Sequence, residues 1–271
     1  MKNIRGSKLT LGYENTVIID GVSIEFPMNK ITILIGANGC GKSTMVRSFA
    51  RLLKPMEGQV LLNGRNISTM VNKDISKELA ILPQNPIVAG GITVKELVEM
   101  GRFPYQNWQN KLKAEDKEMV EKALKDTNML EFKDRRLDSL SGGQKQRVWI
   151  AMVLAQGTDI ILLDEPTTFL DVTYQIEILD LIYKLNREKG KTIVMVLHDL
   201  NLSSRYADHM IALKDKRVYR QGTPDQVVTK DLIKDVFGMD CEIIKDPLYK
   251  TPMLVPYSQA IWSSSPASQA I

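Results

Sequence analysis

A glycine-rich segment at residues 36–43 has the composition and spacing of a phosphate-binding loop. It reads GANGCGKS, it follows an apolar run, and a helical pattern comes directly after it. Glycines let successive backbone N–H groups converge on an anion, and the N-terminus of the next helix adds positive potential at the same point. We therefore expect a site for nucleotide phosphates formed by Gly36, Asn38, Gly39, Cys40, Gly41, Lys42, Ser43 and Thr44.

Three side chains of this loop have chemistry of their own. Lys42 carries a full positive charge for the β- and γ-phosphates, where it would also assist catalysis. Ser43 offers a hydroxyl oxygen, which is a hard ligand suited to Mg²⁺. Cys40 is either a tolerated small residue or, as the sharper hypothesis, a thiol whose pKa is lowered by the helix N-terminus.

Two adjacent carboxylates follow the apolar run at residues 160–163. Ligands of parallel α/β sheets bind at the carboxyl ends of the strands, so this pair is expected at a ligand site. Asp164 would hold Mg²⁺, and Glu165 would orient or deprotonate an attacking water. His198 follows another apolar run, and we expect it to bond to the γ-phosphate or to that water.

The apolar runs before these residues predict the strands of a parallel sheet. Residues 31–35, 160–163 and 192–197 are largely apolar, as strands covered on both faces are. Between the last two, apolar residues recur at helical spacing as far as Gly190, which predicts a βαβ unit. Further strands are predicted at 79–82, 210–213 and 217–219.

The remainder predicts two additional parts around this core. Short strands are expected at 8–11, 16–19 and 22–26, and helices at 94–100 and 115–128 fall in a helical insert at about 88–156. The predicted fold is α/β: a P-loop nucleotide-binding core with a parallel sheet, an N-terminal antiparallel β subdomain and an inserted helical subdomain. We expect one domain over 1–257 and a mobile tail of no assigned role over 258–271.

Composition excludes several classes of protein. With 271 residues and 44% hydrophobic content the chain can bury a sizeable core. A net charge of +4 is too small to argue for nucleic acid, so no nucleic-acid partner is expected. The apolar runs are far shorter than the roughly 20 residues that cross a bilayer, and no secretory signal is visible. Two cysteines suggest no disulfide framework, which favours a cytoplasmic location.

Residues 140–147 read LSGGQKQR, which matches the signature of ATP-binding cassette (ABC) proteins. The chain resembles this family from Lys8 to about Pro256, and its motifs follow the family's order. By this resemblance, Tyr13 stacks on adenine, and Gln84 contacts the Mg²⁺ shell and reports to a transmembrane partner. Asp171 looks like the family's cross-dimer aspartate, although the residues just before it depart from the common small-residue form.

The signature is a second anion site at a helix start. Ser141 is a good N-cap, and Gly142 and Gly143 expose backbone donors ahead of Gln144. Two anion sites in one chain serve a common purpose if they meet across a two-fold dimer. The resemblance thus implies a homodimer that clasps ATP with Mg²⁺, each γ-phosphate lying between one copy's loop and the other copy's Ser141.

A narrower resemblance concerns the transported solute. Residues 94–105 (VKELVEMGRFPY), 149–152, 167–171 and 197–201 are similar to ATPase subunits of importers for ferric siderophores, haem and cobalamin, and together they favour siderophore uptake. Such a subunit would bind a multi-span permease dimer at the cytoplasmic face of the membrane, and an extracytoplasmic substrate-binding protein indirectly. Importers of haem, cobalamin or another solute, an exporter subunit and a non-transport clamp protein remain alternatives. A kinase or GTPase would leave the signature unexplained.

Overall fold

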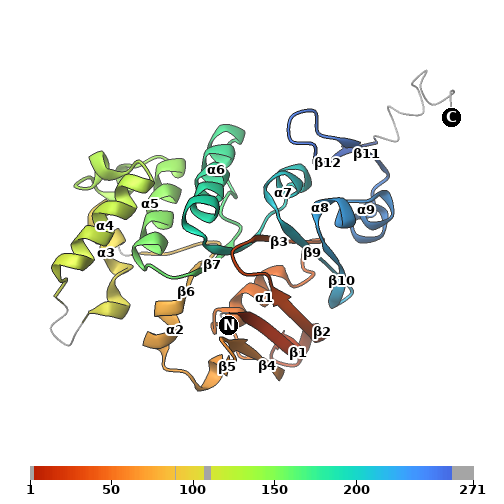
Figure 1. The fold of residues 1–271 in the computed structure, drawn as a ribbon, viewed down its shortest axis with the longest axis horizontal. Coiled ribbons are helices and arrows are strands. Elements are labelled where there is room, and N and C mark those ends of the chain that lie inside the picture. Colours follow the sequence, from red (N-terminus) through yellow and green to blue (C-terminus); the bar gives the residue numbers. More distant parts are fainter. Residues whose placement is uncertain (1–2, 89, 107–110, 258–271) are drawn as a thin grey trace.

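The computed structural model describes residues 3–88, 90–106 and 111–257, and its centre is a six-stranded sheet with the order β10-β9-β3-β8-β7-β6 (Figure 1). The strands from β9 to β6 are parallel, and β10 pairs antiparallel with β9 at the edge. Their bounds are β3 (Ile31–Ile35), β6 (Leu79–Leu82), β7 (Ile160–Asp164), β8 (Thr192–Val196), β9 (His209–Lys214) and β10 (Arg217–Gly222). This confirms the predicted parallel core.

Alternate residues of these strands enter two different hydrophobic clusters, because side chains on a strand point to opposite faces in turn. Ile33, Leu163 and Met195 face the cluster that contains α6 (Val172–Lys189). Leu34, Leu162 and Val194 face the cluster that contains α1 (Lys42–Phe49) and the N-terminal sheet. Every residue of β3, β7 and β8 is buried, which is why their sequences are nearly continuous apolar runs.

The N-terminal sheet is antiparallel and has the order β2-β1-β4-β5. Its strands are β1 (Ile4–Tyr13), β2 (Thr16–Phe26), β4 (Glu57–Leu62) and β5 (Arg65–Asn66). The prediction of two strands within residues 16–26 was wrong, since β2 continues through Gly21. Gly21 has φ 61°, and the pairing with β1 shifts register between Leu9↔Val22 and Leu11↔Ile19, so the glycine forms an irregularity within one strand.

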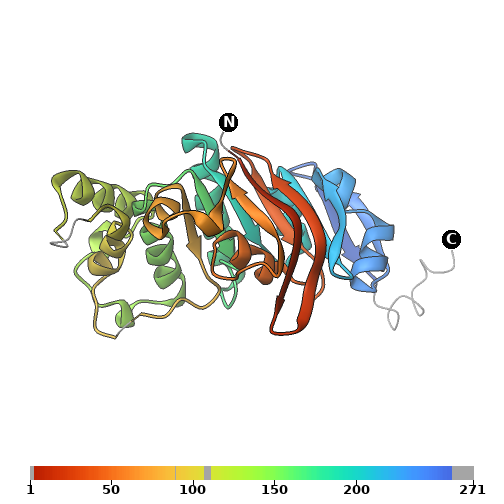
Figure 2. The ribbon, with the colours of Figure 1, turned by 90° about the horizontal axis from the view of Figure 1, so that it is seen from below.

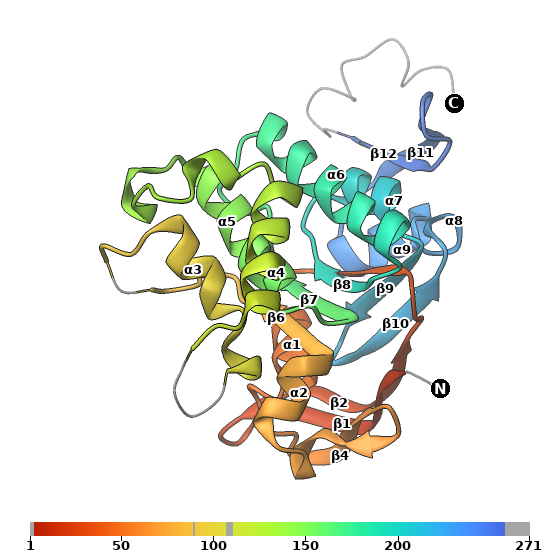
Figure 3. The same cartoon turned by 60° about the vertical axis from the view of Figure 1, so that its left-hand side comes forward.

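Three helices pack together beside this core: α3 (Val94–Met100), α4 (Ala114–Asp126) and α5 (Gly142–Ala155) (Figure 3). Arg102 is buried next to them, with its Nε atom 2.9 Å from Oδ1 of Asp116 and its Nη1 atom 2.7 Å from the carbonyl oxygen of Ala155. These bonds fix the chain after α3 against α4 and the end of α5. The helices fall within the insert predicted at 88–156, whose status as a separate subdomain stays a prediction.

The chain after β8 forms elements that the sequence patterns partly missed. The prediction covered β9, β10 and one or two helices at 223–237, which are α8 (Pro224–Val227) and α9 (Lys230–Phe237). It missed α2 (Asn72–Glu78), α7 (Leu200–Tyr206), β11 (Cys241–Lys245) and β12 (Pro252–Pro256). Asn201 in α7 exchanges two hydrogen bonds with the backbone of Leu254 in β12, at 3.1 and 2.7 Å.

The helical group and the C-terminal hairpin lie at opposite ends of the long axis, with the two sheets between them (Figure 2). The remaining short elements are 3₁₀ turns at Ile67–Thr69, Phe103–Tyr105, Leu130–Phe132 and Leu137–Ser139. Among the described residues, none of the helices has the length and apolar character that crossing a membrane requires. The predicted mobile tail at 258–271 lies outside the described residues.

Candidate active site

The loop between β3 and α1 has a backbone that only glycine adopts readily. Gly36, Gly39 and Gly41 have φ values of 146°, 79° and 104°. A Cβ atom at Gly36 would lie 2.5 Å from the carbonyl oxygen of Leu213, so a side chain there is also excluded by space. The glycines therefore fix the course of the loop from the end of β3 to the start of α1.

Lys42 begins α1 and folds back over this loop. Its side chain is buried, with 5% of the residue exposed, and Nζ donates to the carbonyl oxygens of Gly36 at 2.8 Å and Ala37 at 3.0 Å. These acceptors are neutral and do not compensate the charge. The structure thus holds a buried lysine above the glycine loop, with Asp164 near enough to interact electrostatically, and an anionic ligand would add a direct charge partner.

The environment of Cys40 decides between the two hypotheses for this residue. Its Sγ atom lies 3.9 Å from Nζ of Lys42, whose charge favours the thiolate. Burial nevertheless raises the pKa of the Cys40 thiol above its ordinary value, because desolvation of the thiolate outweighs the effect of Lys42. The expectation of a lowered pKa from the helix N-terminus is wrong.

Ser43 and Asp164 form a side-chain hydrogen bond between two elements of the central core. Oγ of Ser43 donates to Oδ1 of Asp164 at 2.7 Å, which joins the start of α1 to the end of β7. The other oxygen, Oδ2, is buried and has no hydrogen-bond partner among the described residues. Burial raises the pKa of Asp164, and the bond from Ser43 opposes this only in part. A hydroxyl beside an unsatisfied carboxylate oxygen fits a hard divalent cation.

The Glu165 carboxylate collects donors from the ends of two other strands. Nε2 of Gln84, after β6, donates to Oε2 at 2.6 Å, and Nε2 of His198, after β8, lies 2.7 Å from Oε1. Because β6, β7 and β8 are parallel neighbours, their carboxyl ends bring these residues to one edge of the sheet. The sequence predicted each of them separately, and the fold assembles them.

Thr168 also touches this carboxylate, and sequence reasoning did not single it out. Its Oγ1 atom donates to Oε2 of Glu165 at 3.0 Å. A hydroxyl residue three positions after a strand-end carboxylate is the available signal, because a turn there returns the side chain to the carboxylate. Glu165, Thr168 and His198 line a hollow of about 270 Å³.

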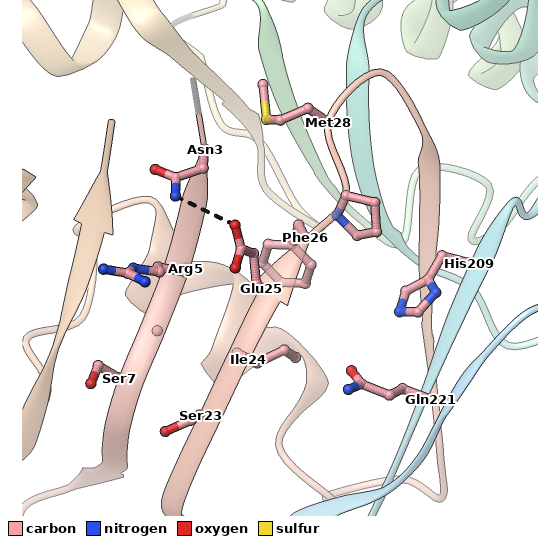
Figure 4. Close-up of a pocket in the computed structure, with 12 residues that line it drawn as sticks. Asn3, Arg5, Ser7, Ser23, Ile24, Glu25, Phe26, Met28, His209 and Gln221 are labelled. Atoms are coloured by element: carbon pink, nitrogen blue, oxygen red, sulfur yellow. Dashed lines mark hydrogen bonds between the residues drawn. The ribbon is translucent and has the colours of Figure 1, made fainter. Parts of the chain in front are cut away.

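A larger hollow of about 710 Å³ lies elsewhere, lined by β1 and β2 on one side and by the pair β9–β10 on the other (Figure 4). Asn3, Glu25, His209 and Gln221 are among its lining residues, and Nδ2 of Asn3 donates to Glu25 at 3.4 Å. None of the predicted site residues lines it. Size alone therefore does not locate the chemistry of this chain.

Tyr13 ends β1 at the surface, with 44% of the residue exposed. Its hydroxyl lies 3.4 Å from Nη1 of Arg47 in α1, the helix that follows the glycine loop. The ring is thus next to the phosphate-loop helix and accessible to a planar ligand. Tyr13 is therefore not a buried core residue of the sheet.

The signature forms the start of α5 with the expected cap. Oγ of Ser141 accepts from the backbone N of Gln144 at 3.3 Å, and Oε1 of Gln144 accepts from the backbone N of Ser141 at 3.0 Å. Gly142 is exposed, whereas Gly143 is buried against Tyr174. These hydrogen bonds stay within the first turn of α5 and do not join the signature to the glycine loop of the same chain.

Asp171 has a local role within the chain. Its Oδ1 atom accepts from the backbone N of Tyr174 at 3.1 Å and so caps α6. The preceding residue types differ from the family's small ones: Phe169 is 90% exposed and has φ 65°. The segment between Glu165 and α6 therefore presents a large apolar side chain to solvent.

The family model for ABC transporters matches residues 19–168, which is more than half of the chain. This chain belongs to the ABC transporter family. It is accordingly an ABC ATPase.

Curated relatives of this ABC ATPase match over nearly their full length. The petrobactin import ATP-binding protein FpuD of Bacillus anthracis is 54% identical over 95% of this chain and 94% of the relative. The achromobactin transport ATP-binding protein CbrD of Dickeya dadantii (strain 3937) is 52% identical, covering 96% of both. The ferric enterobactin transport ATP-binding protein FepC of Escherichia coli (strain K12) is 46% identical over 97% of each.

Solved structures agree on the fold. A metal-chelate type ABC transporter in an inward-facing conformation superposes with a TM-score of 0.83 at 24% identity, over 96% of this ABC ATPase and 99% of that chain. A dimeric ATP-binding cassette bound to ADP and phosphate gives a TM-score of 0.71 at 30% identity, over 81% and 98%. These neighbours confirm the predicted α/β nucleotide-binding fold.

Proposed function

We propose that this ABC ATPase powers the import of a ferric siderophore through a separate membrane permease. The observation that carries this proposal is the shared identity of 46–54% with three siderophore-transport subunits over at least 95% of this chain. The three relatives are named for chemically different siderophores. The common class, rather than one chelate, is therefore what the likeness supports.

Nucleotide binding uses the residues around α1. Tyr13 stacks on adenine, the backbone of residues 36–44 cradles the phosphates, and Lys42 contacts the β- and γ-phosphates. Burial of Lys42 strengthens this contact because the surrounding dielectric is low. Binding of an anion also gives the lysine the charge partner that carbonyl oxygens do not provide.

Ser43, Asp164 and Gln84 would hold Mg²⁺ beside the phosphates. The unpartnered Oδ2 of Asp164 and the hydroxyl of Ser43 are the oxygen ligands that this ion prefers. When bound, Mg²⁺ neutralises phosphate charge that develops during hydrolysis. Gln84 would offer its amide oxygen to the ion and turn away from Glu165, to which its Nε2 donates in this structure.

Hydrolysis requires a base and a phosphate contact at the end of the sheet. Glu165 takes a proton from water as the water oxygen bonds to the γ-phosphorus. The bond from this phosphorus to the bridging oxygen breaks, ADP leaves with the electron pair, and the proton passes from Glu165 to the phosphate product. His198, 2.7 Å from Glu165, is placed to bond to the γ-phosphate.

A second copy of the chain completes each site. The signature at Ser141–Gln144 has its own anion-binding helix start, and Asp171 and Phe169 lie on the segment that leaves Glu165. A two-fold dimer would place the signature of one protomer against the γ-phosphate bound by its partner. Loss of that phosphate removes the attraction, so that hydrolysis opens the dimer.

The permease would dock beside Gln84, on the segment from Gln84 to Tyr105. Ile87 is 94% exposed and Phe103 is 67% exposed, and Met100 is also exposed between them. Large exposed apolar side chains on one segment are a feature of protein interfaces. This contact would hold the subunit peripherally at the cytoplasmic face of the membrane and couple it indirectly to an extracytoplasmic binding protein.

Uptake of labelled chelates by cells that lack this chain tests the proposal. The wild-type chain should restore uptake of ferric siderophore, whereas Glu165→Gln should bind ATP, accumulate dimers and restore no uptake. Haem and cobalamin are supplied in parallel, because restored uptake of one of these alone would assign that solute instead. Co-purification with a multi-span permease separates transport from a clamp function, and a Glu165→Gln chain with wild-type hydrolysis would contradict the assigned base.

A further inference from the structure

The carboxylate of Glu165 has three polar side-chain partners, and these partners differ in the other contacts that the proposed function gives them. Gln84 donates to Oε2 at 2.6 Å, His198 lies 2.7 Å from Oε1, and Thr168 donates to Oε2 at 3.0 Å. Under the proposed function, Gln84 turns to Mg²⁺ and His198 to the γ-phosphate once ATP is bound. Thr168 is assigned no contact with Mg²⁺ or with the γ-phosphate, so its hydrogen bond to Oε2 of Glu165 can persist during turnover.

We propose that Thr168 is a positioning residue for hydrolysis, which acts by holding Oε2 of Glu165 so that Oε1 faces the attacking water. The inference rests on the proposed role of Glu165 as the base. A glutamate side chain has several rotatable bonds, and an unheld carboxylate divides its time among rotamers. Proton transfer needs one orientation within hydrogen-bond reach of the water.

The backbone between β7 and α6 holds Thr168 in this position. Glu165 and Phe169 have φ values of 55° and 65°, a left-handed region that residues with side chains rarely occupy. Such conformations persist where the surroundings fix them, and they gather at functional sites. The backbone N of Thr168 donates to the carbonyl oxygen of Glu165 at 3.4 Å, and Nε2 of Gln175 in α6 donates to that of Leu170 at 2.8 Å.

The turn therefore moves Glu165 and Thr168 as one unit, whereas Gln84 and His198 approach from other strands. Gln84 sits on a segment that we assign to permease docking, so its bond to Oε2 depends on the partner. The bond from Thr168 is local and spans three residues of one turn. The hydrogen bond from Thr168 therefore keeps the Glu165 carboxylate oriented while its contacts with Gln84 and His198 change.

Thr167 offers a matched control for the test. It lines the same 270 Å³ hollow, and no hydrogen bond of its hydroxyl is found in the described part of the chain. Thr168→Val and Thr167→Val make the same isosteric change, at the bonded and the unbonded hydroxyl. Thr168→Ser restores the donor, and Thr168→Ala excludes a clash of the added methyl group as the cause of any loss.

Steady-state hydrolysis by the full-length chain with Mg²⁺ and ATP provides the first readout. We expect Thr168→Val and Thr168→Ala to lower kcat about tenfold with KM for ATP unchanged, because only the orientation of the base is lost. Thr168→Ser and Thr167→Val should stay within about twofold of wild type. Wild-type kcat in Thr168→Val, no rescue by serine or an equal loss in Thr167→Val would overturn the inference.

A double-mutant cycle with Glu165→Gln provides the second readout, measured in single turnovers. Thr168→Val should cause no further loss in the Glu165→Gln chain, since the hydroxyl acts through the carboxylate. A further tenfold loss there would show that Thr168 acts elsewhere. If Glu165→Gln itself turns over at the wild-type rate, the proposed base fails; if only Thr168→Val does so, the base stands and this inference fails.

Discussion

Lys42 is a buried cation whose acceptors are the uncharged carbonyl oxygens of Gly36 and Ala37. We expect Lys42→Ala to weaken ATP binding by about 10- to 100-fold, which corresponds to the loss of a charge-assisted hydrogen bond worth about 1.5–3 kcal/mol. Fluorescent-nucleotide titration measures the affinity, and circular dichroism checks the fold. Unchanged affinity would refute the assigned contact with phosphate.

Replacing Asp164 by asparagine should have opposite effects on stability and on activity. Burial raises the pKa of Asp164, so the ionised carboxylate is less stable in the folded than in the unfolded chain. This penalty is present above the raised pKa and disappears as the pH falls and the group protonates. Asp164→Asn removes the charge and keeps an acceptor for Ser43.

At neutral pH we therefore expect Asp164→Asn to raise the thermal midpoint of the nucleotide-free chain by about 2 °C and to abolish Mg²⁺-dependent hydrolysis. The gain should shrink in calorimetry as the pH is lowered, because the wild-type carboxyl also becomes neutral. A midpoint below that of wild type at neutral pH would contradict the argument.

Residue types predicted many residues of the candidate site, but they did not predict which side chains hydrogen-bond to one another. Asp164 and His198 were predictable because each follows an apolar strand pattern, and the structure places both at the same sheet edge. Thr168 was missed because the spacing of its hydroxyl from Glu165 is a weak signal, which becomes a contact only through the left-handed turn at Glu165 and Phe169. For Cys40 the sequence left two hypotheses open, because it does not give the burial that raises the pKa of the thiol.

At the start of α5, two adjacent glycines respond differently to a side chain. A Cβ atom at Gly142 would have Leu170 as its nearest neighbour at 3.9 Å, whereas one at Gly143 would lie 2.7 Å from Tyr174. We expect Gly142→Asp to fold and bind ATP as a monomer but to lose cooperative hydrolysis, because its carboxylate repels the partner's γ-phosphate.

Gly143→Ala serves as the contrasting variant. Displacement of Tyr174 should lower the free energy of unfolding by about 1 kcal/mol net of the helix propensity that alanine adds. Sedimentation with ATP and thermal denaturation separate the two effects. Normal cooperative turnover in Gly142→Asp would argue against the cross-dimer role of the signature.

Helices and strands with a clear hydrophobic pattern and a buried position were predictable from the sequence, whereas several short elements were not. The strands β3, β7 and β8 are buried on both faces and therefore appear as apolar runs. The strand β12 has a run of only three apolar residues between two prolines, and its place depends on Leu254 pairing with Asn201 far away in the sequence. Gly21 predicts a break that β2 does not have, because residue type alone does not distinguish a bulge from a turn.

For the whole molecule, the exposed apolar residues at opposite ends allow a test of permease docking. Phe103 is on the segment after α3, and Leu248 is 79% exposed between β11 and β12. We expect Phe103→Asp to reduce siderophore uptake at least about tenfold while the purified chain still hydrolyses ATP, since one buried charge costs several kcal/mol. Leu248→Asp should keep uptake, and a reversed pattern would move the docking surface to the hairpin.

The order of the central sheet also constrains how the polypeptide is made. β3 carries the phosphate loop, yet its neighbours are β8 and β9, which the ribosome synthesises much later. The β1–β2 hairpin can form as it emerges, whereas β3 must wait as an unpaired apolar segment. Nascent chains halted before β8 should therefore be the species that aggregate or recruit chaperones.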